Sequence, residues 1–143
     1  MIRFVRREDY ALVIVGMLAQ EYKKRPVPLS LIAKEYAISL LFLRNLANEL
    51  RDAGVIKAIE GKDGGYYLKR DPRRIKMGEI LRIFSKGQDI ACCPLGKKGS
   101  HKRRCPKQKS CLAGNTWRQL NKEFIDKVHK LSLQDFLEYT SSA

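Results

Sequence analysis

Residues 39–69 read SLLFLRNLANELRDAGVIKAIEGKDGGYYLK, and this stretch decides the fold. Its first half places apolar residues at helical spacing and predicts a helix that ends near Ala53. Ser39 is suited to cap this helix and Gly54 to terminate it. The second half alternates over Val55–Ile59 and Tyr66–Lys69, with three glycines between the two segments. That pattern predicts a two-stranded hairpin with a glycine-rich turn. The apolar positions of the helix are Leu40, Leu43, Leu46, Ala47 and Leu50.

Two further helices are predicted before this stretch. One runs from Asp9 to about Tyr22, and the second runs from Ser30, as its N-cap, to about Tyr36. The prolines at 26 and 28 separate them, because proline lacks an amide donor. Three helices followed by a hairpin is the order of a winged helix-turn-helix. In that fold one helix enters the DNA major groove and the hairpin contacts the backbone or minor groove. The predicted fold class is therefore mainly α with a small β-hairpin wing.

The first helix contains an apolar run, Ala11–Ala19, that follows three arginines and so has some features of a signal peptide. Glu8 and Asp9 lie between the arginines and the apolar run, and no small-x-small cleavage site follows the run. The run is also shorter than the ~18 residues of a membrane span. We therefore expect a buried first helix in a cytoplasmic protein that does not enter a membrane.

The 143 residues divide into a predicted DNA-binding domain, 1–75, and a second part, 76–143. The second part begins with a helix from Lys76 to about Ser85, and an aperiodic cysteine loop follows over residues 87–113. A long helix with one apolar stripe comes next. Such a stripe cannot be buried by its own helix, so we expect the same helix of a second copy to cover it in a two-fold homodimer. Ser132 and Asp135 resemble a capping box that opens a last short helix ending near Tyr139. The stripe consists of Trp117, Leu120, Phe124, Val128 and Leu131.

The formal net charge of +14 indicates a polyanionic partner, with nucleic acid favoured over an anionic membrane. The charge is unevenly distributed. Residues 1–70 carry 13 Lys and Arg against 8 Asp and Glu, whereas residues 92–111 carry 7 against none. Residues 112–143 are neutral, with 4 of each sign. Half of the net charge thus lies in the stretch that also holds all four cysteines.

The cysteines are Cys92, Cys93, Cys105 and Cys111. In a cytoplasmic protein they are expected to be metal ligands or redox thiols rather than disulfides. Eleven residues separate Cys93 from Cys105 and five separate Cys105 from Cys111, so the close pairs typical of structural zinc are missing. An iron–sulfur cluster accepts wider spacings, and the nearby cations would favour thiolates. A solvated basic loop with free thiols is the alternative.

The whole chain resembles the iron–sulfur winged-helix transcription regulators, a family that includes IscR and NsrR. The resemblance runs from about Asp9 to Leu131. It rests on Asp9–Leu12, Ile38–Ser39, Leu50–Ile56, Gly61 with Gly64–Tyr66, the C-x5-C spacing of Cys105 and Cys111, and Trp117.

The resemblance implies that three cysteines hold the cluster: Cys105, Cys111 and one of Cys92 and Cys93. The cluster would be of the 2Fe–2S or the 4Fe–4S type. NsrR-like members take a fourth ligand from an acidic residue in the first helix of the other subunit, and Asp9 occupies that position. The alternative for Asp9 is a carboxylate that the helix dipole favours.

Two other residues bear on the fourth ligand. IscR-like members place a histidine three residues after the last cysteine, where this chain has Gly114. His101, inside the loop, is a competing ligand.

The resemblance also implies that residues near the start of the recognition helix face the bases: Ser39, Phe42, Arg44 and Asn45. Arg44 could form two hydrogen bonds with guanine, and Asn45 could do the same with adenine. The alternative for Arg44 is a contact with phosphate alone. Lys62 is the predicted phosphate or minor-groove contact of the wing.

These features predict a homodimeric regulator that binds a double-stranded DNA operator, with its affinity switched by an iron–sulfur cluster. The alternative is a cluster-free winged-helix regulator that senses oxidants or thiol metabolites through its cysteines. A third hypothesis is an electron-transfer protein that does not bind DNA. We expect no enzyme and no small-molecule substrate, since the chain has two histidines and no recognisable nucleophile-and-base arrangement.

Overall fold

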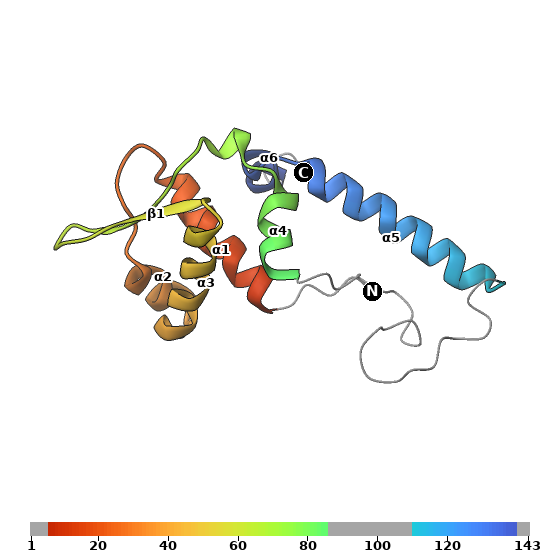
Figure 1. Cartoon of the computed structure of the whole chain (residues 1–143), viewed down its shortest axis with the longest axis horizontal. Helices are drawn as coiled ribbons and strands as arrows, with labels where there is room; N and C mark the ends of the chain where they lie inside the picture. Colours follow the sequence, from red (N-terminus) through yellow and green to blue (C-terminus); the bar gives the residue numbers. More distant parts are fainter. Residues whose placement is uncertain (1–5, 86–109, 140–143) are drawn as a thin grey trace.

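The computed structural model describes residues 6–85 and 110–139 (Figure 1). Within these ranges the chain is mostly helical, with a two-stranded antiparallel hairpin, which confirms the predicted fold class. No helix in the described ranges has the length and apolar content needed to cross a membrane. The elements are α1 (Arg6–Gln20), α2 (Leu29–Tyr36), α3 (Leu40–Asp52), β1 (Ile56–Ile59), β2 (Gly65–Leu68), η1 (Pro72–Arg74), α4 (Met77–Ser85), α5 (Leu112–Lys130) and α6 (Leu133–Glu138).

Helix α1 forms the centre of the core. It begins before the predicted Asp9 and ends at Gln20 rather than Tyr22. Its buried residues recur at helical spacing and face α3 and α4, so the apolar run is a core helix as predicted. The buried hydrophobic side chains are Ala11, Ile14, Val15 and Leu18.

The N-cap of α2 lies two residues earlier than expected, and the prediction of Ser30 as its N-cap is wrong. Pro28 occupies the N-cap position with extended geometry, φ −72° and ψ 140°, and makes no side-chain cap. Ser30 is exposed within the first turn. The reason is burial, because the helix must begin at Leu29 to turn both Leu29 and Ile32 into the core.

Helix α3 begins and ends as predicted. The Ser39 hydroxyl accepts a hydrogen bond from the backbone N–H of Phe42, with an O–N distance of 3.4 Å. Gly54 follows the helix with a left-handed φ of 77°, a conformation that costs glycine little. The buried face consists of Leu43, Leu46, Ala47 and Leu50.

The wing is the β1–β2 hairpin, which projects from the domain in Figure 1. Ile56 pairs with Leu68 and both are buried, whereas Lys57 pairs with Tyr67 on the opposite face. Val27 adds a bridge to the free edge of β2, exchanging two 2.9 Å backbone hydrogen bonds with Tyr66. A Cβ atom on Gly65 would lie 2.7 Å from the Val27 carbonyl oxygen, so this close approach requires glycine.

The second part of the chain differs from the first, because α5 has no buried residue. It extends away from the winged-helix domain in Figure 1. Its C-terminal end is held by two backbone hydrogen bonds, Met77 N–H to Leu131 O at 2.9 Å and Leu133 N–H to Ile75 O at 2.7 Å. The capping box before α6 is present as predicted. The loop was predicted to end at residue 113, but α5 already begins at Leu112.

Candidate nucleic-acid interface and cysteine site

The outer face of α3 lies opposite its buried leucines and is exposed. Arg44 and Asn45, two of the predicted base contacts, are both on this face. Within the described residues neither side chain forms a hydrogen bond or a salt bridge, so both are available to a ligand. Leu41, which is 69% exposed, and Asn48 extend the same face at helical spacing. Sequence reasoning missed these two, although they are the complement of the buried stripe.

Phe42 is placed differently from Arg44 and Asn45. Its ring is half-buried and meets the ring of Tyr10 edge to face, with centroids 5.6 Å apart and an interplanar angle of 85°. This contact ties the start of α3 to α1. Ser39 is exposed, and its hydroxyl is engaged in capping α3. A base contact by either residue stays a prediction.

The wing tip presents Lys62, which is exposed between Glu60 and Asp63. The two carboxylates reduce the local positive potential at the tip, since all three side chains are exposed. The outer face of β1 adds Lys57, also exposed. Lys57 was not among the predicted contacts, although its alternation with buried Ile56 indicates an outward side chain.

The first turn of α1 connects the recognition helix to the end of α4. The Arg7 guanidinium forms a salt bridge with Glu49 of α3. The same guanidinium lies 5.8 Å from the centroid of the Phe84 ring. Phe84 is near the end of α4, which the cysteine loop follows in the sequence. Asp9 is exposed in this turn. A local sequence pattern gives no sign of these contacts, because Arg7 and Glu49 are 42 residues apart.

Cys111 is the cysteine that the structure describes. It is the N-cap of α5, and its half-buried sulfur accepts a hydrogen bond from the Gly114 N–H at 3.3 Å. Cysteine ligates metal and reacts with oxidants through its sulfur, and an amide hydrogen bond to the sulfur is compatible with ligation. The Cys111 sulfur is therefore suited to be a cluster ligand. Cys92, Cys93, Cys105 and His101 lie outside the described residues.

Asp9 and Cys111 are not brought together within one chain. Figure 1 shows the first turn of α1 and the start of α5 well apart. Among the described residues, no three His, Cys, Asp or Glu side chains gather to hold a metal ion. A site that uses both residues therefore requires more than one copy of the chain.

Comparison with known proteins agrees with this architecture. The chain is 29% identical to the HTH-type transcriptional regulator IscR of Xenorhabdus nematophila over 136 residues, which is 95% of this chain and 79% of the relative. Its fold is similar to that of CymR, the global cysteine regulator of B. subtilis, with a TM-score of 0.73, 25% identity, and coverage of 97% and 98% of the two chains. It is also similar to T. potens IscR, with a TM-score of 0.69, 28% identity, and coverage of 96% and 88%.

A match to a family as a whole also covers nearly the entire sequence. Residues 4–139 match the Rrf2 family, which is described as an iron-dependent transcriptional regulator. The match includes the winged helix, the cysteine segment and the long helix α5. The chain therefore belongs to the Rrf2 family of DNA-binding transcriptional regulators.

Proposed function

We propose that this protein is a homodimeric, sequence-specific regulator whose operator affinity is switched by an iron–sulfur cluster. The observation that carries the proposal is the position of Cys111 at the N-terminus of α5, with its sulfur accepting an amide hydrogen bond. Amide hydrogen bonds to thiolate ligands tune the reduction potential of such clusters. The same residue ends the cysteine segment and starts the helix proposed to form the dimer.

The proposed ligands are Cys105, Cys111 and one of Cys92 and Cys93, with Asp9 of a second copy as the fourth. The separation of Asp9 from Cys111 within one chain supports this sharing between copies. Asp9 is exposed, so its carboxylate is accessible to a neighbouring chain. When bound, an iron–sulfur cluster supplies a centre that reacts with oxidants or nitric oxide.

Homodimerisation through α5 is supported by the side chains that the helix leaves exposed. Trp117 is 59%, Leu120 51% and Phe124 43% exposed, and all three belong to one stripe. A second copy of α5 offers the same stripe in return, as a two-fold interface requires. The dimer would place two α3 helices on successive major-groove faces about one helical turn, ~10 bp, apart.

DNA recognition is assigned to the outer face of α3, with Arg44 and Asn45 reading bases and Lys62 contacting the backbone or minor groove. Arg7 connects this helix to the end of α4, through Glu49 on one side and Phe84 on the other. A change in the cysteine segment would thus act on the residues that hold α3 in place. This route gives the switch a physical path of direct contacts.

The proposal is tested by selecting an operator from random-sequence DNA and by measuring iron and acid-labile sulfide after anaerobic purification. Both operator binding and bound cluster are expected in the wild-type protein. Cys111→Ser should lose the cluster, whereas Ser110→Ala, at the exposed neighbouring position, should retain it. Wild-type protein that binds a defined operator but holds neither iron nor sulfide would refute the cluster.

A second candidate, a cluster-free regulator that senses oxidants or thiol metabolites, is favoured by the same half-buried thiol. A cysteine at a helix N-terminus is also reactive toward oxidants. The similarity to CymR, described as a global cysteine regulator, supports this alternative. Oxidation that abolishes operator binding in colourless, iron-free protein would establish it. The electron-transfer hypothesis has no support in a family of transcriptional regulators.

A further inference from the structure

A pocket of about 390 Å³ lies between the α1–α2 connection and the wing, outside the recognition helix. One wall is formed by Glu21–Pro26, and the other comes from the wing and the residue after it. Figure 1 shows the wing between this connection and the α2–α3 pair. The pocket therefore lies across the wing from the helix proposed to read bases.

Basic residues predominate among the charged residues that line the pocket. Lys23, Lys24 and Arg25 come from the connection and Lys69 from the end of the wing, whereas Glu21 is the one acidic residue of the lining. Glu21 is engaged by Arg25, with an N–O distance of 3.0 Å. Within the described residues, Lys23 and Lys69 form no salt bridge, and the Lys23 ammonium lies 5.5 Å from the centroid of the Tyr22 ring.

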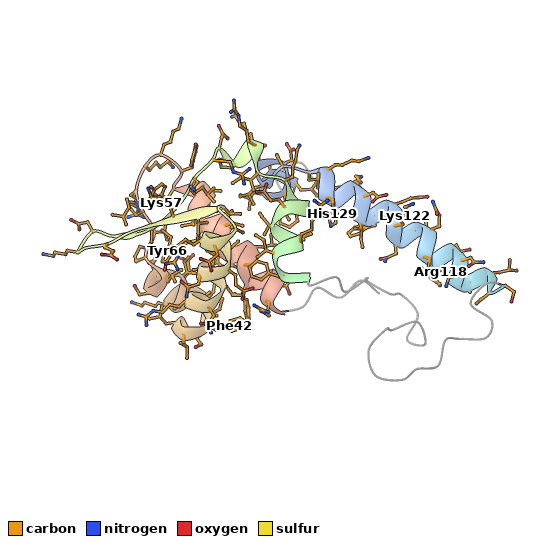
Figure 2. All side chains as sticks on the ribbon, viewed as in Figure 1. Phe42, Lys57, Tyr66, Arg118, Lys122 and His129 are labelled. Atoms are coloured by element: carbon orange, nitrogen blue, oxygen red, sulfur yellow. The ribbon has the colours of Figure 1, made fainter. Side chains whose placement is uncertain are left out.

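The wing continues this basic surface across its outer face. Lys57 lies directly opposite Tyr67 in the hairpin register, and Tyr67 lines the pocket. Figure 2 shows Lys57 and Tyr66 on opposite sides of the hairpin, as the alternation of strand residues requires. Ile59, also in the lining, is the last residue of β1 before the tip that carries Lys62. The pocket therefore adjoins the strand that leads to Lys62, the predicted DNA contact of the wing.

We propose that this basic pocket binds the phosphodiester backbone of duplex DNA beyond the wing, so that it extends the operator interface to flanking sequence. Charge complementarity favours this occupant, because lysines that face phosphates release counterions and gain affinity. Tyr22 and Tyr67 fit the same role, since tyrosine hydroxyls and lysines are common phosphate contacts. The contact carries no sequence information. It adds affinity and positions the wing.

This inference rests on DNA binding by the full chain and is tested with the double variant Lys23→Gln, Lys69→Gln, which neutralises one exposed cation on each wall. The matched control is Lys122→Gln, Lys130→Gln, which removes the same charge from exposed positions on α5. Affinity is measured as a function of salt concentration, on the operator and on a random-sequence duplex of equal length. Urea unfolding of each variant verifies that the fold is retained.

The expected result for the pocket variant is a salt-dependence slope reduced by about two and an affinity reduced by roughly tenfold on both duplexes. The α5 control should keep the wild-type slope. A pocket variant with the slope and affinity of the control would overturn the inference. An unchanged slope with saturable binding of inorganic phosphate at these lysines would assign the pocket to a small anion and would overturn it too. If the wild-type protein itself binds no operator, the proposed function fails, which is a different outcome from an unchanged slope.

Discussion

Helices α3 and α5 are built in opposite ways. The 13 residues of α3 include four that are fully buried, and the 19 residues of α5 include none that is buried. Both helices carry an apolar stripe, and that of α3 is buried within its own chain. The stripe of α5 packs against the core at its C-terminal end, through Val128 and Leu131, and leaves Trp117, Leu120 and Phe124 exposed. Most helices in proteins depend on packing of such a stripe for their stability. The difference supports the proposal that a second copy covers the exposed part of α5, whereas α3 is packed within one chain.

The largest effect that this comparison predicts is in the core of α3. Leu46→Ala removes a fully buried side chain and should lower the free energy of unfolding by about 2–5 kcal/mol, because it leaves a cavity. Urea denaturation of the full chain measures this loss. Leu41→Ala, on the exposed face of the same helix, should change stability by no more than about 0.5 kcal/mol. Equal losses for the two variants would contradict the assignment of the buried face.

Trp117→Ala tests the other half of the comparison. It should weaken the dimer by about 2 kcal/mol, roughly thirtyfold in dissociation constant, because large aromatic side chains dominate interfaces. Sedimentation velocity over a range of concentrations measures the dissociation constant. Lys122→Ala, on the polar side of α5, should leave it unchanged. A wild-type protein that stays monomeric at all concentrations would refute the dimer.

The fold was largely predictable from sequence because its signals are local. The Ser39 cap and the Ser132–Asp135 capping box depend on spacings of three residues, and both are present. The predicted start of α2 was wrong because the burial of Leu29 outweighed the preference of serine for the N-cap position. At the site, Arg44 and Asn45 were expected from the family resemblance, and both side chains are exposed on α3. The Arg7–Glu49 pair and the basic pocket were not predictable, because each joins segments far apart in sequence.

A smaller effect is expected where the packed domain meets DNA. Arg44→Ala should weaken operator binding by about 1–3 kcal/mol and relax discrimination at one base pair, because arginine pairs with guanine through two hydrogen bonds. The control is Arg51→Ala, which removes the same charge from the C-terminal turn of α3. Binding to operators substituted at each position distinguishes the roles. Uniform weakening without loss of discrimination would show that Arg44 contacts only phosphate.

The smallest effect concerns the junction between α5 and α6. Hydrogen bonds from Ser132 hold the pKa of Asp135 below its ordinary value of 3.8. Because the pKa is lower in the folded protein than in the unfolded chain, the carboxylate stabilises the fold above about pH 4 and loses this effect as pH falls through the folded value. Asp135→Asn should therefore be less stable than the wild type at pH 7, and the difference should shrink towards pH 3. Urea titrations at both pH values measure it, and a difference that does not depend on pH would exclude this role for the carboxylate.

In the proposed function, the state of the cysteine loop controls DNA binding by the winged helix. The most direct test is operator binding by cluster-loaded and cluster-free protein, prepared anaerobically from the same sample and compared at one salt concentration. The two forms are expected to differ in operator affinity or in footprint. Equal affinity and equal footprint for the two forms would contradict it.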